Sequence, residues 1–112
     1  MEPLRRRADF EQVFSSGTFV GGRTVSLRIL ERGEGATRVG FAVGKRLDKR
    51  AVIRNRVRRR LREVLGRLKL RGGYDVVVIA RRSALSDGSV ALGRDVAAVC
   101  GRAGLLPEEH VE

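Results

Sequence analysis

One segment, residues 45–71, carries the whole net charge of this 112-residue chain. It holds thirteen Lys and Arg residues against Asp48 and Glu63, and the rest of the chain is balanced, so this segment accounts for the net charge of +11. Apolar residues recur within it at spacings of three and four, which is typical of a helix with one buried face. We therefore predict a helix over residues 49–69 that buries one stripe and exposes cations elsewhere. The predicted stripe consists of Ile53, Val57, Leu61, Val64, Leu65 and Leu68.

Polar and glycine residues mark the ends of this helix. Asp48 is a predicted N-cap, because a carboxylate can accept hydrogen bonds from the free N–H groups of a first turn. Gly72 and Gly73 are predicted to end the helix. A shorter helix is expected over residues 6–15, where Phe10, Val13 and Phe14 fall on one face before Gly17. A last helix is expected over residues 92–102, with Leu92, Val96, Val99 and Cys100 on its apolar side.

The strands follow from alternation and from β-branched composition. Residues 23–31 and 37–43 each alternate apolar and polar side chains, and Gly33-Glu34-Gly35 separates them, so we predict an antiparallel hairpin. The segment around Phe19 and Val20 is a candidate for one more strand. Residues 74–80 form an unbroken apolar run, which predicts a central strand covered on both faces. Ser86-Asp87-Gly88 is a predicted turn, and the acidic tail of residues 107–112 is expected to fray.

This order predicts an α+β fold of one domain over residues 1–112, with its core at about residues 4–104 and a sheet of about four strands packed with helices, in the order αβββαβα. If the strands on either side of the basic helix are parallel, general chirality rules favour a right-handed crossover.

The concentrated charge predicts a polyanionic partner, because phosphate contacts with Arg and Lys release counterions and steer association over long range. A merely solvated helix face would mix charges of both signs, and this one does not. DNA is disfavoured as the partner, since a helix that buries one side lacks the exposed reading face that a major groove requires. The candidate RNA-binding residues on this helix are Arg50, Arg54, Asn55, Arg56, Arg58, Arg59, Arg60 and Arg62.

The chain offers no catalytic residue. His110 lies in the tail, Cys100 lies on an apolar helix face, and the carboxylates are scattered without metal-ligand spacing, so a two-metal nuclease site is not expected. A single cysteine excludes an internal disulfide and favours a reducing, cytoplasmic setting. The sequence has no apolar run long enough for a membrane span and no secretory signal at its start, so we expect no membrane partner.

The string Ala51-Val52-Ile53-Arg54-Asn55-Arg56-Val57-Arg58-Arg59-Arg60-Leu61-Arg62 closely resembles the RNR motif of the bacterial ribonuclease P protein subunit. The segments around it resemble the same family with spacing intact. The strand at residues 38–43 leads to the basic pair Lys45-Arg46, and the strand at residues 74–80 is followed by Arg81. Phe10, Phe14 and Gly17 resemble the first helix of that family, so the resemblance covers roughly residues 4–100.

The resemblance implies a sheet with a left-handed β-α-β crossover, like the second domain of a small-subunit ribosomal protein, in place of the generic right-handed one. It implies an RNA-binding subunit of an endoribonuclease that removes the 5′ leader from precursor tRNA, with catalysis by a large RNA that binds the required Mg²⁺. It also implies that Asn55 lies near bound metal, although a plain surface asparagine explains this residue equally well.

The resemblance further implies a cleft for the single-stranded leader between the first helix and the sheet. Its candidate residues are Phe10, Phe14, Phe41, Lys45 and Arg46. The residues alone favour core positions for Phe10 and Phe14, whereas the resemblance favours contact with unpaired bases, which stack on aromatic rings. Arg28 stands where many relatives have an aromatic residue on the cleft wall, so leader preference is expected to differ here.

Two other classes of function share the basic helix. A ribosomal-protein-like assembly factor would need no groove for a single strand, and reconstitution with the catalytic RNA distinguishes it. An autonomous nuclease would cleave precursor tRNA with Mg²⁺ and without any RNA partner.

Overall fold

The computed structural model describes residues 1–86 and 88–107. The predicted turn at Ser86-Asp87-Gly88 falls partly outside these residues, and most of the predicted frayed tail, with His110, lies outside them. No helix in the described ranges is long and apolar enough to cross a membrane. The elements are β1 Glu2–Pro3, α1 Arg7–Ser16, β2 Thr18–Val20, β3 Val25–Glu31, β4 Arg38–Ala42, α2 Ala51–Gly66, β5 Tyr74–Ala80, α3 Ser83–Ser86 and α4 Ser89–Arg102.

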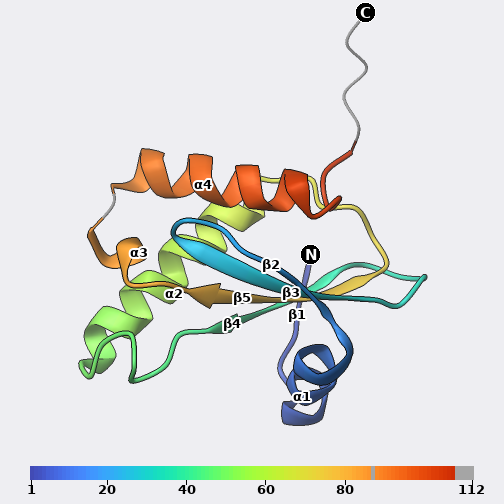
Figure 1. Cartoon of the computed structure of the whole chain (residues 1–112), viewed down its shortest axis with the longest axis horizontal. Coiled ribbons are helices and arrows are strands. Elements are labelled where there is room, and N and C mark those ends of the chain that lie inside the picture. The colour runs from blue at the N-terminus through green and yellow to red at the C-terminus, as the bar shows by residue number, and fades with distance from the viewer. Residues whose placement is uncertain (87, 108–112) are drawn as a thin grey trace, which may run out of the picture.

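The fold is an α+β sandwich around one mixed sheet, as predicted. The sheet has five strands, in the order β1-β4-β5-β3-β2, where about four were predicted. In Figure 1, α2 and α4 cover one face of the sheet and α1 lies on the opposite side. The main core lies between the sheet and α2 with α4, where Val57 and Leu61 meet Leu27 and Val78. A smaller cluster of Leu4, Val13 and Val77 attaches α1 to the other face.

The predicted hairpin between residues 23–31 and 37–43 is wrong. Both segments are strands, but β5 lies between them and pairs antiparallel with β3 and parallel with β4. Alternation reports which side chains are buried and does not report which strand is the neighbour. The strand with apolar side chains on both faces takes the central place, because only there is each face covered. Val76, Val77 and Val78 of β5 are all at most 1% exposed.

Two predicted features of the sheet are confirmed. Phe19 and Val20 belong to the short edge strand β2, and β5 is the central strand expected from its apolar run. The segments β4, α2 and β5 form a parallel β-α-β unit, so the basic helix does connect parallel strands. The left hand of this crossover stays a prediction from the resemblance. The strand β1 and the four-residue helix α3 were not expected from the sequence.

The ends of α2 differ from the prediction. Arg50 is the N-cap, and the Asp48 carboxylate accepts hydrogen bonds from the Arg50 backbone N–H at 2.8 Å and from its guanidinium. These bonds lower the pKa of Asp48 to about 2. The helix ends at Gly66, before Gly72 and Gly73, because the following residues form a separate turn that is anchored elsewhere. Arg71 N–H donates to the Leu105 carbonyl, and Gly73 N–H donates to the Gly35 carbonyl.

A buried carboxylate joins the sheet to α1. Asp75 on β5 is 3% exposed and accepts two hydrogen bonds from Arg38 on β4, at 2.8 and 2.6 Å. The Nε of Arg32 lies 2.7 Å from Asp75 Oδ1. Arg38 also reaches Asp9 on α1 at 3.5 Å. The Asp75 hydrogen bonds raise the pKa of Arg38 above its ordinary value. This group of charges fixes the position of α1 against one end of the sheet.

We predict that Asp75→Ala lowers the free energy of unfolding by about 2 to 3 kcal/mol, because removing the buried carboxylate leaves the Arg38 and Arg32 guanidiniums without their ion-pair partner. This loss is smaller than for a fully buried ion pair, because the Arg38 and Arg32 side chains keep 29% and 31% of their surface in water. Urea unfolding followed by circular dichroism measures it, with exposed Glu34→Ala as the control. A loss no larger than that of the control would contradict this role for Asp75.

We also predict that Cys100 is unreactive in the folded protein. Cys100 lies on the buried side of α4, in the main core, and burial raises the pKa of its thiol to about 11, so only about one thiol in ten thousand is ionised at pH 7. A disulfide reagent added at pH 7 should label it only as fast as the chain unfolds, and rapidly in urea. Immediate stoichiometric labelling of the native protein would show that this part of the core is open.

Candidate nucleic-acid interface

The cations of α2 point outward because its apolar residues point inward. Val57, Leu61 and Leu65 are at most 3% exposed and pack into the main core. A helix fixed on the sheet by one stripe must present its remaining arc to solvent. Arg56, Arg59 and Arg62 are exposed on that arc, and Arg54, Arg58 and Arg60 are half-buried along its sides. The predicted burial of the helix is therefore confirmed at the centre of its stripe.

Two of the half-buried arginines, Arg54 and Arg58, hydrogen-bond to neutral acceptors. Arg54 Nη1 donates to the backbone carbonyls of Asp48 and Lys49 at 3.1 and 2.7 Å. Arg58 donates to Asn55 Oδ1 at 2.9 Å and to the Val43 carbonyl at 3.3 Å. These acceptors are neutral, so they orient the guanidiniums without cancelling their charge. Arg50 differs from them, because its guanidinium pairs with Asp48 at 2.9 Å.

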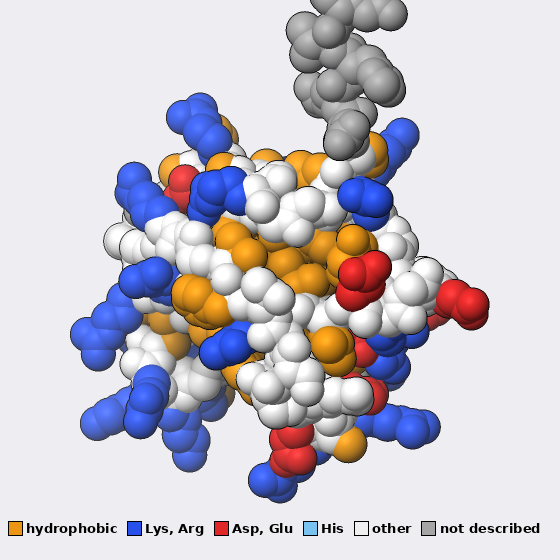
Figure 2. Space-filling model, turned by 45° about the vertical axis from the view of Figure 1, so that its right-hand side comes forward, with side chains coloured by type: hydrophobic (Ala, Val, Ile, Leu, Met, Phe, Trp, Pro, Cys, Tyr) orange, Lys and Arg blue, Asp and Glu red, His pale blue; other side chains and the backbone are white. Residues whose placement is uncertain are grey.

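The surface charge follows from this arrangement. In Figure 2, Lys and Arg side chains are densest along the lower left of the molecule, whereas several acidic side chains lie toward the right and bottom. A surface rich in one sign of charge attracts a polyanion and holds it through several phosphates at once.

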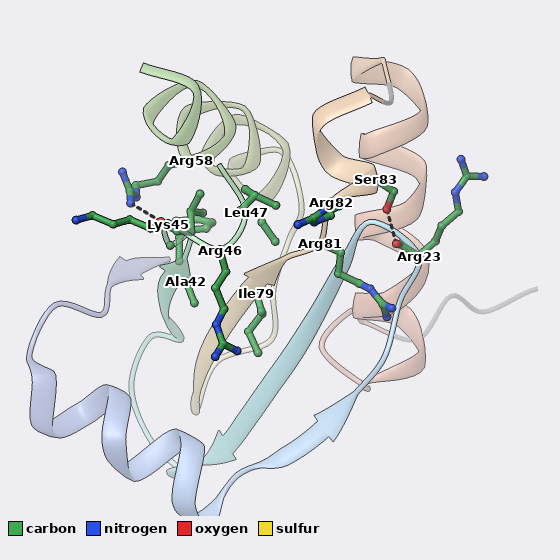
Figure 3. A pocket seen from close by; sticks show the side chains of 14 residues that line it. Arg23, Ala42, Lys45, Arg46, Leu47, Arg58, Ile79, Arg81, Arg82 and Ser83 are labelled. Atoms are coloured by element: carbon green, nitrogen blue, oxygen red, sulfur yellow. Dashed lines mark hydrogen bonds between the residues drawn. The ribbon is translucent and has the colours of Figure 1, made fainter. Parts of the chain in front are cut away.

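A groove of about 930 Å³ opens beside the N-terminal half of α2, and we name it the main groove. Its apolar floor includes Ala42 of β4 and Ile79 of β5. Figure 3 shows cationic side chains from several separate segments around it. The residues that line it are Arg23, Phe41, Ala42, Val43, Gly44, Lys45, Arg46, Leu47, Arg58, Ile79, Ala80, Arg81, Arg82 and Ser83.

Three of these cations, Arg23, Arg81 and Arg82, were missed as site residues by the sequence analysis. Arg81 and Arg82 follow β5 just as Lys45 and Arg46 follow β4. Because β4 and β5 are parallel neighbours, the segments that follow them leave the sheet at the same edge. The repeated pattern of a strand followed by a basic pair would have identified this cluster, had the pairing of the two strands been known. Lys49 joins Lys45, Arg46 and Arg82 around an adjoining hollow.

A second groove of about 640 Å³, the edge groove, lies between the first residues of the chain, α1 and α2. Phe10, Phe41, Arg58 and Arg62 are among the residues that line it. The Arg62 guanidinium lies 5.8 Å from the centre of the Phe41 ring, in cation–π geometry. The Phe10 ring lies directly on Gly40, where a β-carbon would overlap it. Phe41 and Arg58 line both grooves, so the two are continuous there.

The structure thus distributes the five candidate leader residues over two grooves and one further position. Lys45 and Arg46 are exposed at the main groove, Phe10 is half-buried in the edge groove, and Phe41 belongs to both. Phe14 lines neither groove and is 42% exposed on the last turn of α1. Its exposure means that the core alternative, which the residues alone favoured, does not hold for Phe14.

Asn55, the tentative metal ligand, is exposed, and its Oδ1 accepts a hydrogen bond from Arg58. Within residues 1–86 and 88–107, no group of three or more His, Cys, Asp or Glu side chains is arranged to hold a metal ion. A single amide oxygen surrounded by cations binds Mg²⁺ only if other oxygens complete the coordination.

Comparison with known proteins identifies the family. The family model described as ribonuclease P matches residues 1–104. The chain belongs to the ribonuclease P protein family. The protein component from Symbiobacterium thermophilum is 43% identical over 109 residues, which span 95% of this chain and 94% of that protein. The protein component from Pseudanabaena is 36% identical over 106 residues, spanning 92% and 91%.

Solved structures of the family share the fold. The ribonuclease P protein of Thermotoga maritima superposes with a TM-score of 0.81 at 25% identity, over 91% of this chain and 97% of that one. The Staphylococcus aureus protein gives a TM-score of 0.83 at 24% identity, over 96% and 99% of the two chains. Members of this family are protein components of ribonuclease P, an endoribonuclease holoenzyme, and the chain belongs to that holoenzyme in the same capacity.

Proposed function

We propose that this chain acts in ribonuclease P by binding, with α2 on the catalytic RNA and the main groove on the 5′ leader of precursor tRNA. The observation that supports the proposal is that two features of the surface adjoin each other. The first is the arc, the outward face of α2 with its arginines, which are Arg54, Arg56, Arg58, Arg59, Arg60 and Arg62. The second is the main groove, which has an apolar floor and cationic walls and opens at the N-terminal half of the same helix. A folded RNA can occupy the arc while an unpaired strand lies in the groove.

The arc suits a structured RNA. Arginine guanidiniums hold phosphates through two parallel hydrogen bonds, and Arg56, Arg59 and Arg62 are exposed along the helix for this purpose. Neutralising closely spaced phosphates lowers the concentration of Mg²⁺ that the RNA needs to fold. In this proposal the RNA binds the Mg²⁺ and performs the cleavage. Asn55 lies near the bound metal and is not one of the groups that hold it.

The main groove suits a single strand. Ala42 and Ile79 form an apolar floor for bases or riboses, and Lys45, Arg46, Arg81 and Arg82 surround it with charge. Unpaired RNA exposes its base faces and its phosphates together, and it is therefore recognised by surfaces that combine apolar area with cations. A duplex hides its base faces and would use only the rim. The leader is the part of precursor tRNA that distinguishes it from mature tRNA.

An assembly factor of the ribosomal-protein class would use the arc and have no use for the groove. Reconstitution at low Mg²⁺ separates the two functions, since only a ribonuclease P subunit should restore cleavage by the catalytic RNA. Cleavage of precursor tRNA by the purified chain with Mg²⁺ and no RNA partner would instead favour an autonomous nuclease.

We predict that replacing Arg54, Arg56 and Arg58 together with alanine weakens binding to the catalytic RNA and flattens the salt dependence. If each arginine contacts one phosphate, the slope of log affinity against log salt falls by about 2 to 3. Filter binding at several salt concentrations measures the slope. The matched control removes three exposed cations outside the arc, Arg67, Lys69 and Arg94. Equal slopes for the two triple variants would contradict a dedicated arc.

We predict that the double variant Lys45→Ala, Arg46→Ala weakens holoenzyme binding to precursor tRNA about tenfold and leaves mature tRNA nearly unaffected, since two charge-assisted phosphate contacts are lost. Competition binding with both tRNAs measures the ratio. The control is Arg67→Ala with Lys69→Ala, which removes the same charge away from the groove. An equal loss for both tRNAs would assign these residues to the catalytic RNA instead.

A further inference from the structure

The segment of residues 21–23 connects β2 to β3 and lies closely against α4. The Arg102 guanidinium on α4 donates to the Gly21 carbonyl at 2.7 Å. An added β-carbon at Gly22 would lie 3.2 Å from the Val99 side chain, so the main chain approaches the helix closely there. Because Val99 and Arg102 are three residues apart on one helix, they lie on the same face, and that face fixes the course of the segment.

Three arginines from distant parts of the chain meet at this segment, and we name Arg23, Arg81 and Arg102 the arginine cluster. Arg23 belongs to the segment itself. Arg81 follows β5 and donates to the Gly22 carbonyl at 3.1 Å. Ser83 Oγ donates to the Arg23 carbonyl at 2.7 Å, a bond that Figure 3 shows. Hydrogen bonds from α4 on one side and from the residues after β5 on the other therefore hold the cluster in place.

The cluster keeps an excess of positive charge. All three arginines are exposed, and the carbonyls that Arg81 and Arg102 bind are neutral. Asp95 Oδ2 lies 3.9 Å from Arg23 Nε, which is too long for a hydrogen bond, and this oxygen is buried and has no hydrogen-bond partner among the described residues. Three positive charges beside one carboxylate form a surface that attracts an anion.

The cluster reaches around the end of the sheet from one face to the other. Arg23 and Arg81 line the main groove, whose floor residues Ala42 and Ile79 lie on the face that carries α1. Arg102 lies on α4, which covers the opposite face. An RNA that contacts Arg102 on α4 therefore lies outside the groove that we assign to the leader.

The surface of α4 beside Arg102 suits the backbone of a double helix. The helix contains no aromatic residue, and its exposed positions next to Arg102 include Ala98 and Gly101, which are small. Such a surface offers no ring on which an unpaired base can stack, and it lets a rounded duplex come close enough for its phosphates to meet the guanidiniums. Double-stranded RNA is recognised mainly through its shape, its phosphates and its 2′-hydroxyl groups.

We infer that the arginine cluster binds the phosphates of a double-helical segment of the catalytic RNA, as a second contact separate from the arc. This inference rests on the proposed function, in which α2 holds the catalytic RNA and the tRNA stem adjoins the leader near the site of cleavage. In Figure 3, Arg23 and Arg58 of α2 lie on opposite sides of the main groove, so a duplex at the cluster is far from that stem. Asp95 limits the affinity, because its carboxylate competes with a phosphate for Arg23.

The first test measures binding of the full chain to the catalytic RNA by filter binding at several salt concentrations. The double variant Arg23→Ala, Arg102→Ala should bind about tenfold more weakly, and its slope of log affinity against log salt should fall by about 1 to 2. The control is Arg67→Ala with Lys69→Ala, which removes two exposed cations outside both the arc and the cluster. Equal slopes for the two double variants would overturn the inference.

Asp95→Asn tests the same site by a gain of affinity, which loss of structure cannot produce. Removing the carboxylate leaves the three arginines and their hydrogen bonds to carbonyls in place, so the catalytic RNA should bind about two- to fivefold more tightly at low salt. The gain should be smaller in the Arg23→Ala background, because the competition for Arg23 is then absent. Unchanged or weaker binding by Asp95→Asn would overturn a role for the cluster in binding phosphates.

A tethered iron–EDTA probe on Ala98→Cys identifies which RNA lies at the cluster. Ala98 is exposed and Cys100 is buried, so the reagent should label the new thiol selectively in the native holoenzyme. Radicals from this position should cut a helix of the catalytic RNA. The same probe on Glu34→Cys, in the loop at the other end of β3, should leave that helix intact. Cuts confined to the tRNA stem or to the leader would overturn the assignment to the catalytic RNA.

The inference and the proposed function fail in different ways. If the Arg54, Arg56, Arg58 variant binds the catalytic RNA more weakly and the Arg23, Arg102 variant binds it as the wild type does, only the arginine cluster is overturned. If the wild-type chain binds an unrelated duplex RNA as tightly as the catalytic RNA, the proposed function is overturned, and the second contact with it.

Discussion

The burial of one stripe on α2 is the interaction on which the rest of this molecule depends. Val57, Leu61 and Leu65 must reach the core, and this fixes the rotation of the helix about its axis. The arginines between them are then forced to the outside, where closely spaced like charges repel one another. The fold therefore holds in place a charge density that would be unfavourable without a polyanion, and binding RNA relieves the repulsion.

The central strand β5 provides the second constraint. With apolar side chains on both faces, it is stable only between β3 and β4, with helices on one side and α1 on the other. Placing it there makes β4 and β5 parallel neighbours, so Lys45 and Arg46 emerge beside Arg81 and Arg82. The same core packing that stabilises the sheet thus assembles a cationic groove from segments that are distant in the sequence. The Asp75 charge group keeps α1 toward the other end of the sheet.

Much of the fold could be predicted because burial leaves a periodic pattern in the chain. The helix stripe, the alternation of β3 and β4 and the apolar run of β5 each identified an element. The pairing of strands could not be read in this way, since a strand's alternation is the same whichever neighbour it has. The N-cap was misassigned for a related reason. Asp48 does accept backbone and side-chain hydrogen bonds, but from Arg50, which is itself the N-cap because the helix begins at Ala51, two residues later than expected. Short elements such as β1 and α3 leave too few residues for any period to appear.

The sequence by itself determined the α+β class, the cationic face of α2 and the family, because each depends on residue types at short and fixed spacings. Only the tertiary structure decided which distant residues share a surface: that Arg81 and Arg82 join Lys45 and Arg46, that Phe41 connects two grooves, and that Phe14 is exposed. It also decided that Arg81 and Arg102 meet at the segment that connects β2 to β3. Contacts between segments depend on strand order and register, which the whole core selects together, so no local pattern contains them.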